Sequence, residues 1–224
     1  MNNNIINVAI DGPAGAGKST VARGAAKQLG YIYVDTGALY RAIGVNALRN
    51  GVNTKDKAAV AASLDGVKVN LVFENGGQKV MLNGEDVSVE IRTPEASMAA
   101  SDVSAVPEVR AFLFDLQRDI AKRNSCIMDG RDIGTVVLPQ AQVKIFLTAS
   151  PEIRAERRYK ELIEKGSEVD YQSVLDDIVK RDYNDSHRAI APLKPAEDSV
   201  LFDTTGLALD ESVAAITKII KEKI

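Results

Sequence analysis

The sequence predicts an α/β fold in which helices flank a five-stranded parallel sheet. Five short apolar runs carry this prediction, and several are unbroken rather than alternating, as expected of strands that are covered on both faces. These runs are residues 5–10, 31–34, 125–129, 143–147 and 199–203. Helical stretches separate them, which indicates βαβ connections. A chain of 224 residues is long enough for one α/β domain with insertions.

The first apolar run leads into a glycine-rich loop. Residues 12–19 read Gly-Pro-Ala-Gly-Ala-Gly-Lys-Ser and fit the pattern G-x-x-x-x-G-K-[ST] at every position, with a helix expected over residues 20–29. Such a loop turns backbone N–H groups toward phosphate oxygens, and the helix N-terminus adds partial positive charge. The lysine can reach the β- and γ-phosphates, and the serine hydroxyl can approach Mg²⁺. We therefore assign nucleoside triphosphate binding to Gly12, Pro13, Ala14, Gly15, Ala16, Gly17, Lys18, Ser19 and Thr20.

Residues 66–90 interrupt the alternation of strands and helices. Apolar and other residues alternate over 67–73, and a second apolar stretch at 80–82 follows Asn75-Gly76-Gly77 and ends at Asn83-Gly84. This pattern predicts a small antiparallel hairpin inserted into the chain. The insert either forms a separate subdomain or is an excursion without a role.

Two helices are expected between residues 150 and 190. Ser150 is placed as an N-cap, Pro151 as the first helical residue and Gly166 as the end of the first helix. The second helix is expected after Asp170, with residues 166–169 as a mobile connection.

Composition restricts the class of protein. The net charge of −3 argues against non-specific binding of nucleic acid. The single cysteine, Cys126, excludes an internal disulfide, suits a reducing compartment and lies in an apolar run typical of a packed thiol. No apolar stretch reaches the length of a membrane span, and the N-terminus has no signal-peptide pattern. We expect a cytoplasmic protein without nucleic-acid or membrane partners.

Charged residues follow two of the predicted strands. Arg41 comes soon after the second strand, in the segment Asp35-Thr36-Gly37-Ala38-Leu39-Tyr40-Arg41. Ligands of open parallel sheets lie at the carboxyl ends of strands, so Arg41 is placed to hold an anion, with a surface arginine as the alternative. Asp129 ends the third strand and begins Asp129-Gly130-Arg131-Asp132. An acid there suits a position near Mg²⁺, and an ordinary strand-end turn is the alternative.

The remaining basic residues fall on the two helices after residue 150. If one helix runs through Arg181, Asp185 and Arg188, their spacing places them on one face. Arg154, Arg157 and Arg158 crowd one helical turn, which requires compensation by acids or by a bound anion. Arg157 is our choice for the arginine that closes over the triphosphate. For Arg154 and Arg158, surface pairing with Glu152, Glu156 and Glu161 is an equal alternative.

Several arginines beside a phosphate loop point to phosphoryl transfer, which depends on positioning and charge neutralisation. A hydroxyl acceptor benefits from a general base, whereas a phosphate acceptor is already an oxyanion. The chain supplies scattered arginines and no base–histidine pair. A phosphorylated acceptor such as a nucleoside monophosphate is therefore favoured.

These segments resemble those of bacterial cytidylate (CMP) kinases, which are nucleoside monophosphate kinases. The resemblance extends over essentially the whole chain and rests most specifically on the segments at 84–93 and 129–137; its other parts are residues 10–19, 35–41, 143–147, 181–182 and 188–193. Position 19 is Ser19 where many relatives have glycine, and position 36 is Thr36 where serine is common.

The resemblance implies a P-loop NTPase-type core over about 1–38, 102–150 and 190–224. It also implies a monophosphate-binding part with the hairpin insert over about 39–101 and a short helical lid over about 154–170. The implied reaction is phosphoryl transfer from ATP to CMP, with dCMP as a further acceptor. The implied cofactor is Mg²⁺, with Ser19 as a candidate ligand, and the implied state is a monomer.

The resemblance also implies roles for individual residues. Catalysis falls to Lys18, Arg131, Arg157 and Arg188. Arg41, Arg131 and Arg188 hold the phosphate of CMP, and Arg181 and Asp185 reach its sugar. Ser101, Arg110 and Asp132 read the base, with Thr36 near the same pocket.

The base assignment has a physical basis. A carboxylate such as Asp132 accepts a hydrogen bond from the N4 amino group of cytosine, whereas uracil presents an acceptor there. An unpaired buried polar group costs about 1–3 kcal/mol, so CMP is expected over UMP. Alternatives are a kinase for UMP or another small acceptor, and a nucleotide-dependent switch or binding module, although the Asn-Lys-x-Asp motif that reads guanine is absent from the sequence.

Overall fold

The computed structural model describes residues 5–74, 77–164 and 166–224, which divide into two compact units. The five-stranded sheet has the order β2-β6-β1-β7-β8. Its strands are β1 (Asn7–Asp11), β2 (Ile32–Asp35), β6 (Cys126–Gly130), β7 (Val143–Thr148) and β8 (Val200–Asp203). All five predicted strands are present and each begins within two residues of its predicted start, so the predicted parallel sheet is confirmed.

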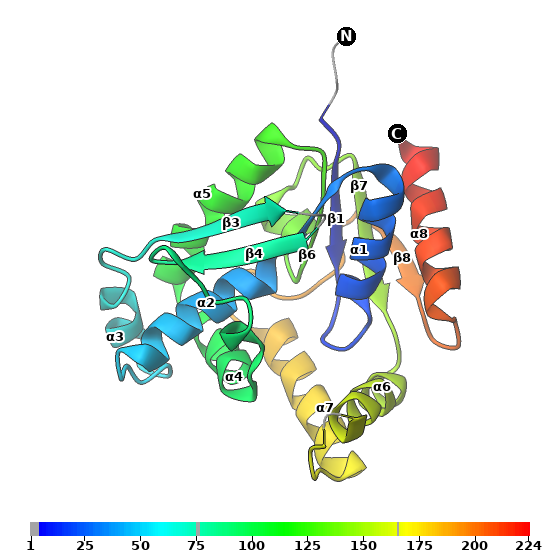
Figure 1. Cartoon of the computed structure of the whole chain (residues 1–224). Helices are drawn as coiled ribbons and strands as arrows, with labels where there is room; N and C mark the ends of the chain where they lie inside the picture. Colours follow the sequence, from blue (N-terminus) through cyan, green and yellow to red (C-terminus); the bar gives the residue numbers. More distant parts are fainter. Residues whose placement is uncertain (1–4, 75–76, 165) are drawn as a thin grey trace. The chain divides into compact units, whose positions relative to one another are not determined.

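The second unit, residues 6–31 and 127–224, contains most of this sheet. Strand β1 pairs in parallel with β7, and β7 with β8. Helices α1 and α8 lie side by side in this unit (Figure 1). Its helices are α1 (Lys18–Leu29), the π-helical turn η2 (Ile133–Val137), α6 (Pro151–Glu164), α7 (Tyr171–His187) and α8 (Leu209–Lys223).

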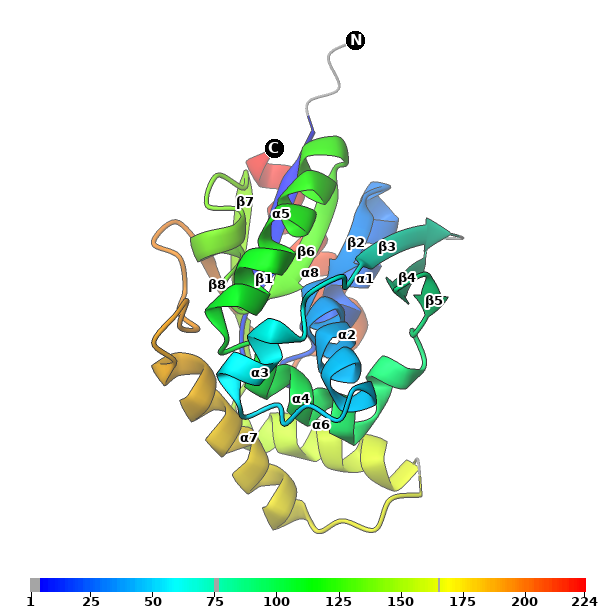
Figure 2. The same cartoon turned by 90° about the vertical axis from the view of Figure 1, so that its left-hand side faces the viewer.

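Helices α6 and α7 pack against each other as a pair (Figures 1 and 2). Ala155, Val174 and Ile178 form a small apolar cluster between them. The Ser150 hydroxyl accepts a hydrogen bond from the Ile153 N–H at the start of α6, and the Asp170 carboxylate caps α7. The predicted starts of both helices are thereby confirmed. Helix α6 extends to Glu164, next to Lys165, which lies outside the described residues, and α7 ends at His187 and leaves Arg188 in extended backbone.

The first unit, residue 5 and residues 32–126, combines β2 with the smaller sheet and four helices. The helices are α2 (Thr36–Arg49), α3 (Lys57–Ala62), α4 (Pro94–Val103) and α5 (Pro107–Arg123), with a 3₁₀ turn η1 (Glu90–Arg92). Thr93 caps α4, and proline occupies the first position of α4 and α5. These signals explain why the chain enters helices there.

The predicted hairpin is confirmed and extended by a third strand. β3 (Val69–Glu74) pairs antiparallel with β4 (Gly77–Leu82), which pairs with β5 (Glu85–Asp86). The turn residues Asn75 and Gly76 lie outside the described residues. Val69, Val80 and Leu82 belong to the hydrophobic core of the first unit, so the insert is packed into this unit. Figure 2 shows β3, β4 and β5 together.

Cys126 is fully buried at the start of β6, as predicted for a packed thiol. Burial raises the pKa of its thiol to about 12, which disfavours the reactive thiolate form. Within the described residues, no helix is both long and apolar enough to span a membrane.

Candidate active site

The glycine-rich loop joins β1 to α1, as the sequence predicted. Gly12 has φ +149°, and a Cβ added there would lie 1.9 Å from the carbonyl oxygen of Leu147. No side chain fits at that position, so glycine is required by close approach to β7 and by its backbone conformation. Gly15 and Gly17 also have positive φ, at +74° and +86°. The loop therefore has a backbone conformation that residues other than glycine rarely adopt.

Lys18 begins α1 and is only 6% exposed. Its Nζ donates a hydrogen bond to the carbonyl oxygen of Pro13 over 2.7 Å. The pKa of Lys18 is lowered to about 7, mainly by burial and also by the positive charge of Arg131, while Asp129 and Asp11 act in the opposite direction. An anion bound in the loop would favour the charged form of this lysine.

Ser19 and Asp129 meet across the end of β6. The Ser19 hydroxyl donates to Oδ2 of Asp129 over 2.7 Å. A hydroxyl and a carboxylate beside a phosphate loop are oxygen ligands of the kind that Mg²⁺ binds through one or two side chains. This pair fits a magnesium site, and Ser19 lies where the motif places the metal-binding hydroxyl.

Asp11 is a buried residue that the sequence interpretation missed. Its Oδ1 accepts from the N–H of Ile133 over 2.8 Å, and its Oδ2 from the N–H of Gly134 over 2.7 Å. Burial raises the pKa of Asp11 to about 6, although the two backbone bonds act in the opposite direction. The carboxylate ties the end of β1 to the turn that follows Asp132. Its position directly before the glycine loop was the available signal.

Two ion pairs join α7 and the chain after it to the segment after β6. Nε of Arg131 lies 2.8 Å from Oδ2 of Asp185, and Nη2 of Arg188 lies 3.2 Å from Oδ1 of Asp132. Arg188 also donates to the carbonyl oxygen of Ala191 over 2.6 Å. The prediction that one helix carries Arg181, Asp185 and Arg188 is wrong for Arg188, because α7 ends one residue earlier. The structure nevertheless brings Arg131, Asp132, Asp185 and Arg188 together through contacts across the sequence.

The three arginines at the start of α6 have different environments. Arg158 pairs with Glu161 at the surface, which is the surface alternative considered for it. Arg157 donates to the carbonyl oxygen of Thr204 over 3.0 Å, and a Cβ added to Gly17 would lie 3.9 Å from its Nη1. It therefore lies beside the phosphate loop.

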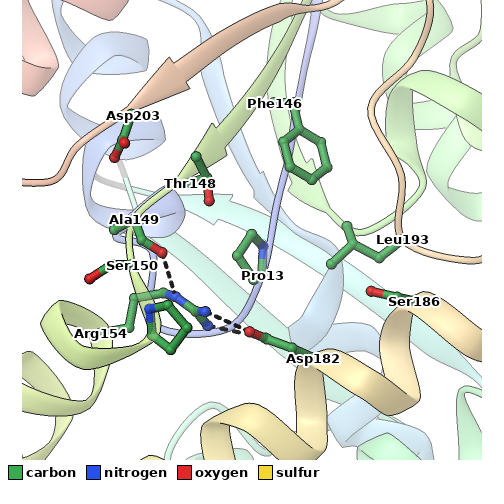
Figure 3. A pocket seen from close by; sticks show the side chains of 11 residues that line it. Pro13, Phe146, Thr148, Ala149, Ser150, Arg154, Asp182, Ser186, Leu193 and Asp203 are labelled. Carbon is green, nitrogen blue, oxygen red and sulfur yellow. Dashed lines mark hydrogen bonds and ion pairs between the residues drawn. The ribbon is translucent and has the colours of Figure 1, made fainter.

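For Arg154, the surface alternative is wrong. The side chain is buried, and its Nη2 lies 2.5 Å from Oδ2 of Asp182, a residue 28 positions away on α7. Figure 3 shows this pair at the wall of a cavity of about 410 Å³, which Pro13, Phe146 and Leu193 also line.

Arg181 lies on α7 in the second unit. The first unit holds the predicted site residues Thr36, Arg41, Ser101 and Arg110, of which Thr36 and Arg110 are buried. Asp35 caps α2 by accepting from the N–H of Ala38 over 2.9 Å, and its other oxygen lies 2.8 Å from Nη2 of Arg41. In the described part of the chain, the buried Nε of Arg41 has no hydrogen-bond acceptor. A buried guanidinium donor without an acceptor is what an oxyanion ligand would complete.

The hairpin insert contacts Asp35, the residue that pairs with Arg41. Oε1 of Gln78 on β4 accepts from the N–H of Asp35 over 2.9 Å, and its Nε2 lies 3.4 Å from the carbonyl oxygen of Asp35. The Arg110 guanidinium lies 5.8 Å from the centre of the Tyr40 ring. Ser101 lies on α4 and is half-buried. The insert thus fixes the backbone that carries the Asp35 carboxylate and, through it, Arg41.

Comparison with known proteins identifies relatives over nearly the whole chain. The family model described as cytidylate kinase matches residues 8–222. A cytidylate kinase from Caldicellulosiruptor bescii is 49% identical, with 98% of this chain and 99% of the relative covered. One from Lactobacillus johnsonii is 52% identical, with 99% and 96% covered. A solved structure from Eubacterium ventriosum, of an uncharacterised protein, is 13% identical, with a TM-score of 0.53 and with 96% of this chain and 98% of that chain covered.

Proposed function

The chain belongs to the cytidylate kinase family, and from this premise we infer that it transfers the γ-phosphoryl group of ATP to CMP, giving ADP and CDP. The family match over residues 8–222 is the observation that carries this conclusion. The bond between the β,γ-bridging oxygen and the γ-phosphorus of ATP breaks, and a bond forms from an oxygen of the CMP phosphate to that phosphorus. ADP leaves with the bridging oxygen.

We assign binding of the donor triphosphate to residues 12–20, among them Lys18. Burial lowers the pKa of Lys18, and the negative charge of a bound triphosphate would raise this pKa and favour the ammonium form. Arg157, which lies beside the loop, is assigned to the charge that develops on the moving phosphoryl group. Ser19 and Asp129 would hold Mg²⁺, which supplies charge neutralisation at the β- and γ-phosphate oxygens when it is bound.

We assign binding of the CMP phosphate to Arg131, Arg188 and Arg41. Arg131 and Arg188 are each held by a carboxylate, from Asp185 and Asp132. The assigned roles imply that both ion pairs are replaced when CMP binds. The two arginines then bind the phosphate of CMP, Asp185 accepts a hydrogen bond from a ribose hydroxyl, and Asp132 accepts one from the cytosine amino group. Each of these four charges, of which Asp132 is buried and the others are half-buried, then keeps a partner before and after binding, which limits the desolvation cost.

We assign reading of the base to Asp132, Arg110 and Ser101, with Thr36 near the base, and binding of the sugar to Arg181 and Asp185. Arginine and serine can donate to O2 and N3 of cytosine, and the carboxylate accepts from N4. The ribose 2′-hydroxyl adds one contact among several, so dCMP is expected to be a slower but real acceptor. The helices around residues 154–170 are assigned the role of a lid that excludes water as a competing acceptor.

A coupled ADP-release assay tests the reaction. CMP is expected to be the preferred acceptor, dCMP the second, and UMP at least tenfold poorer in kcat/KM, because uracil turns an acceptor toward Asp132. Preference for AMP or GMP, or release of ADP that does not depend on any nucleotide acceptor, would contradict the assignment. Direct separation of CDP from CMP on an anion-exchange column distinguishes transfer from hydrolysis.

A further inference from the structure

Arg154 lies where three parts of the second unit meet. Its Nε donates to the carbonyl oxygen of Ala149, after β7, over 2.9 Å. Its Nη1 donates to the carbonyl oxygen of Ala14, inside the phosphate loop, over 3.0 Å, and to Oδ1 of Asp182 over 3.0 Å. Nη2 donates to the second oxygen of Asp182. Figure 3 shows the guanidinium between Ala149 and Asp182.

These contacts use most of the donors that a guanidinium has, and the residue is 2% exposed. A charge at that depth is tolerated because a carboxylate and two carbonyl oxygens replace its water. The bidentate geometry with Asp182 is specific to arginine, because a lysine ammonium is a point donor without the planar fork. The contacts therefore fix Arg154 in one orientation.

The contact with Ala14 has a consequence inside the loop. The peptide between Ala14 and Gly15 is trans, so the Ala14 carbonyl and the Gly15 N–H point in opposite directions. Gly15 has φ +74° and no Cβ, so no side chain of its own limits how this peptide is oriented. Holding the carbonyl toward Arg154 directs the Gly15 N–H away from Arg154.

We propose that Arg154 is a positioning residue of the donor site: it holds the Ala14–Gly15 peptide so that the Gly15 N–H faces the triphosphate, and it links that peptide to helix α7 through Asp182. Arg154 does not contact the nucleotide in this role. It acts through a peptide group that belongs to the phosphate-binding loop. The inference rests on the proposed donor role of residues 12–20.

The experiment compares Arg154→Gln and Arg154→Lys with the matched control Arg158→Gln. Arg158 lies one turn further along α6, and its guanidinium pairs with Glu161 at the surface. The probe is ADP, titrated by calorimetry, with KM for ATP and for CMP measured separately. Arg154→Gln is expected to weaken ADP binding and to raise KM for ATP about tenfold, because one hydrogen bond to a charged phosphate is lost. KM for CMP at saturating ATP is expected to change less than threefold.

Two readouts separate positioning from general stability. The amide signal of Gly15 in a ¹⁵N-labelled protein is expected to shift on addition of ADP in wild type and in Arg158→Gln, and to shift less in Arg154→Gln. Arg154→Lys keeps the positive charge and can make one hydrogen bond, so its ADP affinity is expected to lie between those of wild type and Arg154→Gln. It also provides the comparison with wild type if Arg154→Gln does not fold. Asp182→Asn, which leaves both carbonyl bonds in place, is expected to have a smaller effect than Arg154→Gln.

Equal ADP affinities in Arg154→Lys, Arg154→Gln and Arg158→Gln, with an unchanged Gly15 shift, would overturn the inference. So would a loss of thermal stability in the Arg154 variants with no change in KM for ATP. A wild-type protein that binds ADP and does not phosphorylate CMP would overturn the proposed function instead, and the comparison of variants by ADP affinity would still stand.

Discussion

The hydroxyl of Ser19 donates a hydrogen bond to the carboxylate of Asp129, 110 residues further along the chain, over 2.7 Å. The two residues come from the start of α1 and from β6. Their oxygens lie beside the loop that we assign to the donor phosphates, and they are of the kind that Mg²⁺ binds. Ser19 is one of the two positions, with Thr36, at which the sequence departs from many relatives, and its hydroxyl contacts a carboxylate at the end of β6.

Replacing Ser19 by alanine should raise the Mg²⁺ concentration at half-maximal rate roughly three- to tenfold, which corresponds to the loss of one modest oxygen contact. Ser19→Thr should behave like wild type, since the motif accepts either hydroxyl. Initial rates at fixed ATP over a Mg²⁺ titration give the value. Superimposable curves for Ser19→Ala and wild type would remove Ser19 from the metal site.

Replacing Asp132 by asparagine should reduce discrimination between CMP and UMP. The variant can turn a donor toward O4 of uracil, whereas the wild-type carboxylate cannot. Activity on both substrates should fall because Asp132 also pairs with Arg188. The ratio of kcat/KM for CMP to that for UMP is therefore the diagnostic quantity, and we expect it to drop at least tenfold. A ratio unchanged from wild type would show that the base is read elsewhere.

Replacing Gln78 by alanine should raise KM for CMP about three- to tenfold and leave KM for ATP unchanged. The amide of Gln78 fixes the backbone of Asp35, whose carboxylate orients Arg41. Lys79→Ala is the matched control, because Lys79 is the next residue on β4 and pairs with exposed Glu74. Steady-state kinetics of both variants measure the effect. If Gln78→Ala and Lys79→Ala behave alike, the insert does not act through this amide.

Asp11 should give stability a specific pH dependence. Its pKa is raised to about 6 in the folded protein and lies near 4 in the unfolded chain, so the folded state binds the extra proton between pH 4 and 6. The contribution of this group to the free energy of unfolding therefore falls as pH rises through that window and is constant above it. Its size is about 2–3 kcal/mol from the size of the shift.

Urea unfolding of wild type and Asp11→Asn at closely spaced pH values isolates the contribution. The difference in free energy of unfolding, wild type minus variant, should decrease from pH 4 to 6 and be flat from pH 6.5 to 8. A difference that rises with pH would mean that the two backbone N–H groups outweigh burial. The constant difference between pH 6.5 and 8 serves as the internal control.

The helices and strands could be predicted from the sequence because the residues that start and end them are neighbours along the chain. Pro151 and Asp170 fix the starts of α6 and α7 through proline geometry and side-chain capping, and both signals are legible in the sequence. Gly12 was identified through its motif, and the close approach of Leu147 explains why nothing larger fits. The hairpin was readable from alternation and turn residues.

Long-range pairings could not be predicted in the same way. Arg154 was weighed against the acids next to it in sequence, whereas its partner is on another helix. Arg188 was placed on α7 by spacing, although the helix ends before it. Gln78 carried no motif, and its contact with Asp35 spans 43 positions. Each of these depends on tertiary packing, which residue spacing does not encode.

The buried state of Cys126 leaves the folded enzyme without an accessible native thiol. A cysteine introduced at an exposed position, such as Ile163→Cys near the end of α6, would then be the only site open to a maleimide dye or a nitroxide. The native sequence is thus already a suitable background for spectroscopy. Distances from such a label to a fluorescent nucleotide would follow the helix pair through each turnover.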